Sequence, residues 1–567
     1  MLHPVVSICL HLEVGPESCQ PWKTVYAISR KKEKELQRHN RSHGLGTLPE
    51  KGGRDCDGQL VRGDREPLYF SIELLLIVNI SLLPPPHLPP HSTANTSPAS
   101  SFYQHRFGYD NTFWNTLCLR FRSLDIFETA AAEPIPPSFR FEEASIVDLQ
   151  RYDGTYRSVQ QVNPDVFHIA DSLDAERKAG EKRGPLHGIP ILLKDNIATG
   201  DQMDTTAGSL ALLDIRCHPP RDSFLAQRLR AHGAILLGKA CMSEWANFRT
   251  LNGSAHTRYH DPDGWSGRCG QTANAYNTST SPSGSSGGSA VAVALNFVTA
   301  ALGTDTDASI VAPASVQALV GIRPSVGLTS RDLVIPISRS QDTIGPLARG
   351  VEDAAVLLDV LVGRDANDPA TDLPPPPAEW WRNRQPYTSF LNQDIRGMRI
   401  GVPQRDIWFQ ILKRPEEQAV VNKAIETLGK LGAVIVENAN ITTSTEILGT
   451  SFGPKHPEFE LLIRDFKRDL EQYLLQMPAS CPIKRLSDVI EFNRKHSEQE
   501  LAVFGQDVFE LSDKTRFGDE EYWSLLLKVR KLGGGGIDDA LQRHRLDAFV
   551  VPLNWNFFPP QPVAMAG

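Results

Sequence analysis

Two stretches far apart in the chain share one pattern, in which a helix, a glycine and a short apolar strand follow one another. In the first, Asp222 is expected to cap the helix, Gly233 ends it and residues 234–237 form the strand. The second covers residues 416–436, and Gly432 lies between its helix and its strand. Repeated units of this kind predict an α/β fold, in which helices cover a central sheet.

The composition excludes several classes of protein. The 567 residues carry a formal net charge of −8 without a dominant basic block, so nucleic acid is not an expected partner. Eight cysteines are too few for a disulfide scaffold, and no two have the CxxC spacing of a structural zinc site. His256 and His260 lie four residues apart but lack the glutamate of an HExxH motif. No metal site is therefore expected.

The first 138 residues differ in character from the rest. They contain a proline-rich stretch at 84–90, a polar tract at 92–101 and one apolar run at 68–83. That run has 16 residues and includes Glu73, whereas a bilayer span needs about 20 apolar residues, so a membrane segment is poorly supported. We expect residues 1–138 to be a poorly ordered N-terminal extension and residues 139–567 to form one α/β domain. The start of the chain lacks the pattern of a secretory signal, and we expect a cytoplasmic protein.

Three stretches carry candidate chemistry, and the first is an apolar run that leads directly into Lys194. One interpretation is a buried strand whose lysine reaches solvent at the strand end. The alternative is a lysine kept away from water, whose pKa falls so that the amine can act as a base.

The second stretch, residues 279–289, is rich in glycine and serine and includes Ser285 and Ser286. Its composition suits a flexible linker. However, an apolar element follows it without a spacer, which favours a loop that brings backbone N–H groups and hydroxyls close to a ligand. The Gly-Lys-Ser/Thr ending of a phosphate loop is missing.

The third stretch, residues 303–315, places Ser309 between an apolar run and a second apolar element. A strand, a tight turn, a serine and a helix in this order can expose a nucleophilic hydroxyl beside free backbone N–H groups. Alternatively, Ser309 is an ordinary helix-capping serine. The G-x-S-x-G motif of α/β-hydrolases is absent.

The three stretches GIPILLKDNI, SGSSGGS and TDTDASI occur in an order that closely resembles the amidase signature family. The resemblance implies a mixed, twisted β-sheet covered by helices on both sides, and hydrolysis of a carboxylic amide without metal or organic cofactor. It further implies that Ser309 is the nucleophile, Ser285 a bridging serine on a cis peptide and Lys194 the base. The remaining implied site residues surround the nucleophile: Thr306, Asp307 and Ala308 in the oxyanion-binding loop, and Ser286 and Asp305, which orient it.

Three departures from the family pattern qualify the resemblance. Asp307-Ala308 replaces the usual pair of glycines, and Ala308 adds a Cβ where the loop is tight. A helix that the family has before the Asn163-Pro164-Asp165 segment is largely missing near residues 155–162. The chain ends at Gly567, where the family continues, so we expect a C-terminally truncated domain with an uncovered core surface.

Three functions are compatible with the sequence. The first is a stand-alone amidase that releases an acid and an amine or ammonia. The second is a glutaminase-type subunit of an amidotransferase. Two features disfavour it: the long N-terminal extension, and residues 444–532, which are predicted to be mostly helical. The third is a catalytically silent homologue, which the predicted truncation would explain.

Overall fold

The computed structural model describes two N-terminal strands, residues 5–11 and 73–79, and most of the chain from residue 149 onward. Described after those strands are residues 149, 151–253, 262–372, 384–391, 394–404, 415–449, 452–516, 518–553 and 560–566. His256 and His260 lie outside them, as does most of the predicted N-terminal extension.

Eleven of the described strands form one mixed sheet, in the order β12-β11-β13-β2-β1-β9-β10-β8-β4-β5-β3. Its strands are β1 (Val5–His11), β2 (Glu73–Asn79), β3 (Val159–Val162), β4 (Pro190–Lys194), β5 (Ile235–Ala240), β8 (Ala300–Asp305), β9 (Val320–Arg323), β10 (Thr343–Ala348), β11 (Arg399–Val402), β12 (Val434–Glu437) and β13 (Ala548–Pro552). A separate hairpin pairs β6 (Trp265–Ser266) with β7 (Gly270–Gln271). The predicted mixed α/β sheet is confirmed.

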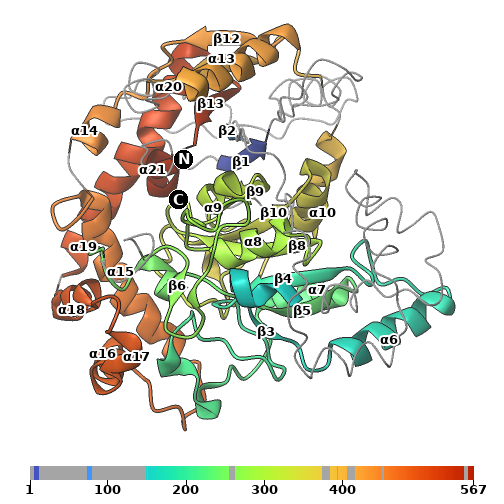
Figure 1. Ribbon diagram of the computed structural model, residues 1–567. Coiled ribbons are helices and arrows are strands. Elements are labelled where there is room, and N and C mark those ends of the chain that lie inside the picture. The colour runs from blue at the N-terminus through green and yellow to red at the C-terminus, as the bar shows by residue number, and fades with distance from the viewer. Residues whose placement is uncertain are drawn as a thin grey trace, which may run out of the picture.

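Helices cover the sheet on both sides, as expected (Figure 1). Figure 1 shows α8 (Gly287–Ala294) and α9 (Val311–Val316) on one side of the strands, with α7 (Phe224–Ala231) and α10 (Val351–Leu361) on the other. Helix α6 (Val166–Lys178) packs against β5, and α13 (Pro415–Lys430) packs against β12. One hydrophobic core runs through these layers from Leu149 to Val563.

Both predicted helix–glycine–strand units are present. Gly233 and Gly432 have φ angles of +81° and +97°, a left-handed conformation that glycine adopts without steric cost. The predicted cap of α7 is wrong by one residue: the hydroxyl of Ser223 accepts the N–H of Ala226. Asp222 instead accepts the N–H of Gly200 at 2.8 Å and forms an ion pair with Arg230.

A group of helices from residues 444–530 flanks the sheet, as the sequence predicts, and Figure 1 shows it along one side. Its members are α14 (Ser444–Leu448), α15 (Pro457–Leu474), α16 (Leu486–Lys495), α17 (Ser497–Glu500), α18 (Asp507–Lys514) and α19 (Asp519–Arg530). Helices α15, α16 and α18 enclose a second hydrophobic core with residues of the sheet domain, including Trp245 and Ile335. No helix in the described ranges is long and apolar enough to cross a membrane.

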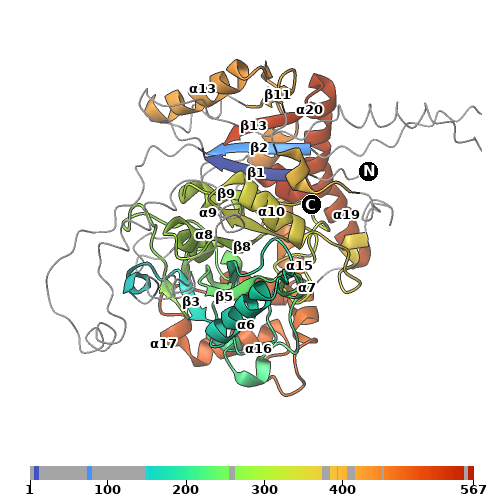
Figure 2. The same cartoon turned by 90° about the vertical axis from the view of Figure 1, so that its right-hand side faces the viewer.

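The two ends of the described chain both contribute to the fold. Figure 2 shows β1 and β2 stacked between β13 and β9, so strands from within residues 1–138 take part in the sheet. After α20 (Gly536–His544) and β13, helix α21 (Pro560–Ala566) is buried at Val563, Ala564 and Met565. This burial gives no support to the expected truncation. The domain boundary at residue 138 stays a prediction.

Candidate active site

Lys194 is the last residue of β4 and is fully buried, so it does not reach solvent at the strand end. Its amine donates hydrogen bonds to Ser285 Oγ at 2.7 Å and to the carbonyl oxygen of Thr304 at 3.1 Å. Burial lowers the pKa of Lys194 to about 7, although the negative charges of Asp305 and Asp342 oppose the shift. Near neutral pH a substantial fraction of this amine is therefore uncharged.

Ser285 follows a cis peptide bond with Gly284, as the resemblance implies. A Cβ at position 284 would lie 2.5 Å from both Asp263 Oδ1 and Ser243 Oγ, so only glycine fits there. The carbonyl oxygen of Ser285 accepts the N–H of Ser243 at 3.1 Å. The segment around Ser285 is thus a buried, closely packed loop, and the flexible-linker interpretation is wrong.

Ser309 lies in the loop between β8 and α9 and is 7% exposed. Its carbonyl oxygen accepts the N–H of Ser286 at 3.2 Å, which joins the two serine-bearing segments. Among the described residues, no hydrogen bond joins Ser309 Oγ to Ser285 Oγ. The structure therefore brings Lys194, Ser285 and Ser309 into one buried region and links the first two directly.

A buried ion pair fixes the far end of the loop that carries Ser309. Asp305 Oδ2 accepts the N–H groups of Ile310 at 2.6 Å and Val311 at 3.4 Å. Its other oxygen accepts from Arg323 Nε at 3.1 Å, and both side chains are at most 1% exposed. Between Asp305 and Ile310, the backbone N–H groups of residues 307–309 donate to no acceptor among the described residues. Unused, converging donors of this kind suit an oxyanion.

Asp307 and Ala308 both have unusual environments. Ala308 has a φ angle of +65°, a left-handed conformation that disfavours a residue with a Cβ. Burial and the nearby charge of Asp305 raise the pKa of Asp307 to about 7, and its Oδ1 has no hydrogen-bond partner in the described structure. The departure from a glycine pair therefore costs backbone strain at one position and places a carboxyl group near Ser309 in the sequence.

Sequence reasoning missed the residues that support Ser285 and Thr306. Trp245, Ala246 and Asn247 form a left-handed turn, and the Asn247 amide donates to Asp263 at 2.6 Å beside Gly284. No periodicity in the sequence identifies a left-handed turn of this kind. Asp342 accepts a hydrogen bond from Thr306 Oγ1 at 2.6 Å, and no sequence pattern pointed to this residue.

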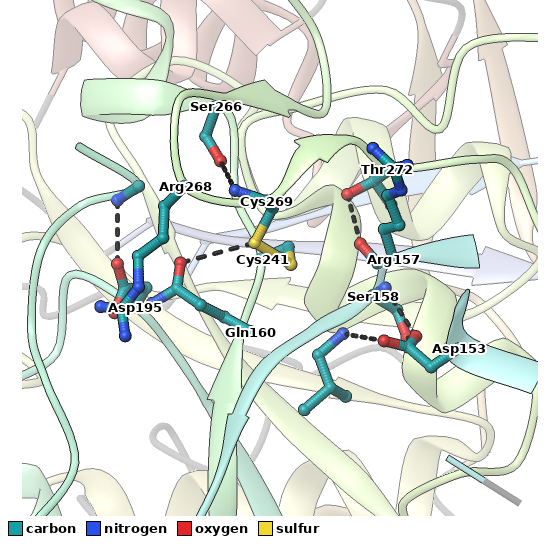
Figure 3. The surroundings of a disulfide bond; sticks show 12 residues. Asp153, Arg157, Ser158, Gln160, Asp195, Cys241, Ser266, Arg268, Cys269 and Thr272 are labelled. Carbon is teal, nitrogen blue, oxygen red and sulfur yellow. Dashed lines mark hydrogen bonds between the residues drawn. A yellow bond between two sulfur atoms is a disulfide. The ribbon is translucent and has the colours of Figure 1, made fainter. Parts of the chain in front are cut away.

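Two disulfides were also missed. Cys241–Cys269 joins the end of β5 to the β6–β7 turn (Figure 3), and Cys217–Cys481 joins the sheet domain to the helical flank. Cys241 is close to the site, because its carbonyl oxygen would lie 2.2 Å from a Cβ at Gly288 in α8. Pairing across 264 and 28 residues leaves no local sequence pattern.

Comparison with known proteins agrees with this arrangement. The amidase family profile matches residues 142–469, a range that contains Lys194, Ser285 and Ser309. The Arabidopsis thaliana protein named "Probable amidase At4g34880" is 37% identical over 440 residues, which are 77% of this chain and 80% of that protein. The A subunit of glutamyl-tRNA(Gln) amidotransferase from Chloroflexus aurantiacus is 38% identical over 296 residues, 52% of this chain and 55% of the subunit.

A solved structure supports the same assignment. Native peptide amidase from Stenotrophomonas maltophilia superposes with a TM-score of 0.66 and is 41% identical, with coverage of 75% of this chain and 84% of that one. The fold and these matches define a hydrolase that acts on amide C–N bonds. The chain belongs to the amidase family.

Proposed function

We propose that this amidase hydrolyses a carboxylic amide through an acyl-enzyme on Ser309, with Ser285 and Lys194 as its proton-transfer partners. The observation that carries the proposal is the buried hydrogen bond of 2.7 Å between Lys194 Nζ and Ser285 Oγ. A lysine whose pKa is lowered to about 7 can accept a proton near neutral pH, which a solvent-exposed lysine cannot do efficiently.

Acylation begins with two coupled proton transfers. Neutral Lys194 takes the proton of Ser285 while Ser285 takes that of Ser309, and Ser309 Oγ attacks the amide carbonyl carbon. The N–H groups of residues 307–309 donate to the developing oxyanion, each worth about 3–4 kcal/mol in comparable sites. Ser285 then protonates the leaving nitrogen as the C–N bond breaks, and protonated Lys194 returns a proton to Ser285. Water later hydrolyses the ester of Ser309.

The two other functions are less well supported. Matches to the A subunits from Chloroflexus aurantiacus and Moorella thermoacetica cover 55% and 71% of those subunits, whereas the match to the Arabidopsis relative covers 80% of that protein. A glutaminase subunit would need partner chains, so activity of the purified chain alone separates the two functions. A silent homologue would have no reason to keep an uncharged lysine beside a serine, because burying that amine costs stability.

The test is hydrolysis of a panel of aliphatic, aryl and amino-acid amides by the purified chain, followed as release of ammonia or amine. We expect turnover of at least one amide and its loss in Ser309→Ala. Ser389→Ala is the matched control, because this exposed serine lies in a short 3-10 helix, Tyr387–Phe390, away from the site. Turnover that survives Ser309→Ala would exclude this nucleophile.

The disulfides also bear on the compartment. Disulfides are rare in cytosolic proteins because thiol reductants keep cysteines reduced. Cys217–Cys481 and Cys241–Cys269 therefore favour an oxidising compartment over the cytoplasmic location expected from the start of the sequence. Thiol labelling of the protein from its native source decides the point, because four of its eight cysteines should be protected before reduction.

A further inference from the structure

Asp342 is a buried carboxylate at the site to which the mechanism above gives no role. It is 8% exposed and lies just before β10. One oxygen accepts from Thr306 Oγ1 at 2.6 Å, and the other accepts the N–H groups of Ile337 at 2.9 Å and Ser338 at 3.0 Å. With Thr304 and Asn196, Asp342 and Thr306 line a small cavity of about 10 Å³.

We propose that Asp342 is a positioning residue for amide hydrolysis, which holds the nucleophile loop through Thr306 and sets the pH range over which Lys194 is active. This role rests on the proposed function, because it presupposes that Lys194 is the base and Ser309 the nucleophile.

The positioning role follows from where the loop is anchored. Asp305 holds its far end at Ile310, and Thr306 is the one side chain between Asp305 and Ser309 that has a described hydrogen bond. Asp342 is itself fixed by two backbone N–H groups, so it gives Thr306 a rigid partner. The unpaired N–H groups of residues 307–309 lie between these anchors, and misplacing such donors by about 1 Å can cost about 100-fold in rate.

The electrostatic role follows from how each nearby charge is compensated. Asp305 and Asp342 both raise the pKa of Lys194, but Asp305 forms an ion pair with Arg323 at 3.1 Å. Asp342 has no such ion pair among the described residues: its cationic neighbour Arg331 is bound to Asp368 at 2.6 Å.

The other described cations near the site do not neutralise the charge of Asp342. Arg339 lines the same cavity as Asp342 but forms no ion pair among the described side chains. Lys239 pairs with Leu193 in the sheet, so it faces away from Lys194, and its amine donates to Ile197 and Thr205. Asp342 is therefore the less compensated of the two carboxyl groups that act on Lys194. Burial raises the pKa of Asp342 itself to about 7, so its charge acts on Lys194 mainly at and above neutral pH.

The first test is Asp342→Asn, assayed as kcat/KM against pH on the best amide of the panel. Removing the charge should move the acid limb to lower pH, by about 0.5–1 unit, since an opposite charge within several ångströms favours the ammonium form. Asp359→Asn is the matched control: Asp359 likewise accepts two backbone N–H groups and a threonine hydroxyl, but lies in α10. An acid limb that stays in place in folded Asp342→Asn overturns the electrostatic role.

The second test separates hydrogen bonding from shape at residue 306 and does not need Asp342→Asn to fold. Thr306→Val keeps the shape but removes the donor, and should lower kcat by 10-fold or more with little change in KM. Thr306→Ser restores the donor and should recover most of that loss. Thr427→Val, at a partly exposed threonine of α13, is the control for the substitution itself. Equal losses in the Val and Ser variants overturn the positioning role.

Failure of the inference can be told apart from failure of the proposed function. If Ser309→Ala retains turnover, the proposed function fails. If Ser309→Ala is inactive but the variants at residues 342 and 306 behave like their controls, only the role of Asp342 fails.

Discussion

At the scale of single residues, the chemistry of the site depends on groups kept away from water. Lys194 is surrounded by protein on all sides, and this burial outweighs the attraction of Asp305 and Asp342 for a proton. The lysine is therefore close to half-neutral at pH 7, a protonation state that an exposed lysine reaches only near pH 10.

The first prediction concerns the pH dependence of the rate. Because only the neutral amine of Lys194 accepts a proton, kcat/KM should rise with pH through an apparent pKa of about 7 and then level off. Initial rates from pH 5 to pH 10 measure this directly. A profile that still rises steeply between pH 9 and pH 10 would mean that the lysine has an ordinary pKa in the free enzyme.

The second prediction concerns backbone strain at Ala308. Its φ angle of +65° costs an alanine about 1–2 kcal/mol, whereas glycine pays about 0.5–1 kcal/mol in entropy. Ala308→Gly should therefore raise the free energy of unfolding by about 0.5–1 kcal/mol in urea titrations. Ala318→Gly, at a φ of +54° outside the loop, should give a similar gain. A loss of stability in Ala308→Gly alone would show that the loop needs the methyl group.

At the scale of elements, local chemistry explains which features could be predicted from the sequence. Gly233 and Gly432 mark helix ends because each adopts a left-handed φ, and this requirement is visible in the sequence as a glycine after an apolar helix. The left-handed turn at residues 245–247 has no glycine, so packing around it must impose the conformation. Asp342 and the two disulfides depend on partners distant in sequence and leave no local pattern.

The third prediction concerns the disulfide between Cys241 and Cys269. It closes a loop of 28 residues between β5 and the β6–β7 turn, which corresponds to about 3–4 kcal/mol in the chain-entropy account. Cys269 is partly exposed, whereas Cys217 and Cys481 are each 2% exposed. Mild reduction should therefore open Cys241–Cys269 first.

The segment that follows Cys241 links this disulfide to the site, so its reduction can be followed as a loss of activity. Ser243, two residues after Cys241, donates its N–H to the carbonyl of Ser285, so reduction should lower activity before the protein unfolds. Mass spectrometry of alkylated peptides identifies the pair that opens, and Cys269→Ser should already show the lower activity. Full activity with Cys241–Cys269 reduced would show that this disulfide does not support the site.

At the scale of the whole molecule, the sheet joins segments from both ends of the chain. Strands β1 and β2 lie between β13 on one side and β9 on the other, so they connect the C-terminal strands to those that carry the site. The alternating helix–strand pattern after residue 139 predicted the class of fold. It could not predict that strands from residues 5–11 and 73–79 enter the same sheet, because the sequence around them lacks the helix–glycine–strand pattern.

The fourth prediction tests that sheet order. Proline at Leu76 would remove an N–H in β2, which pairs with both Ile8 and Val550. Leu76→Pro should lower the free energy of unfolding by about 2–4 kcal/mol. Ala99→Pro, in the polar tract at residues 92–101, is the control and should change stability little. Equal stability of both variants would mean that residues 1–138 are an independent extension.

The most direct test of the central claim is to trap the nucleophile. A fluorophosphonate should add one phosphonyl group per chain, and peptide mass spectrometry should locate it on Ser309. Labelling should slow by orders of magnitude in Lys194→Ala and Ser285→Ala, because in the proposed mechanism Lys194, which hydrogen-bonds Ser285 at 2.7 Å, activates Ser309 through it. A label on another residue, or labelling of Ser309 at the wild-type rate without Lys194, would contradict the Ser309–Ser285–Lys194 mechanism.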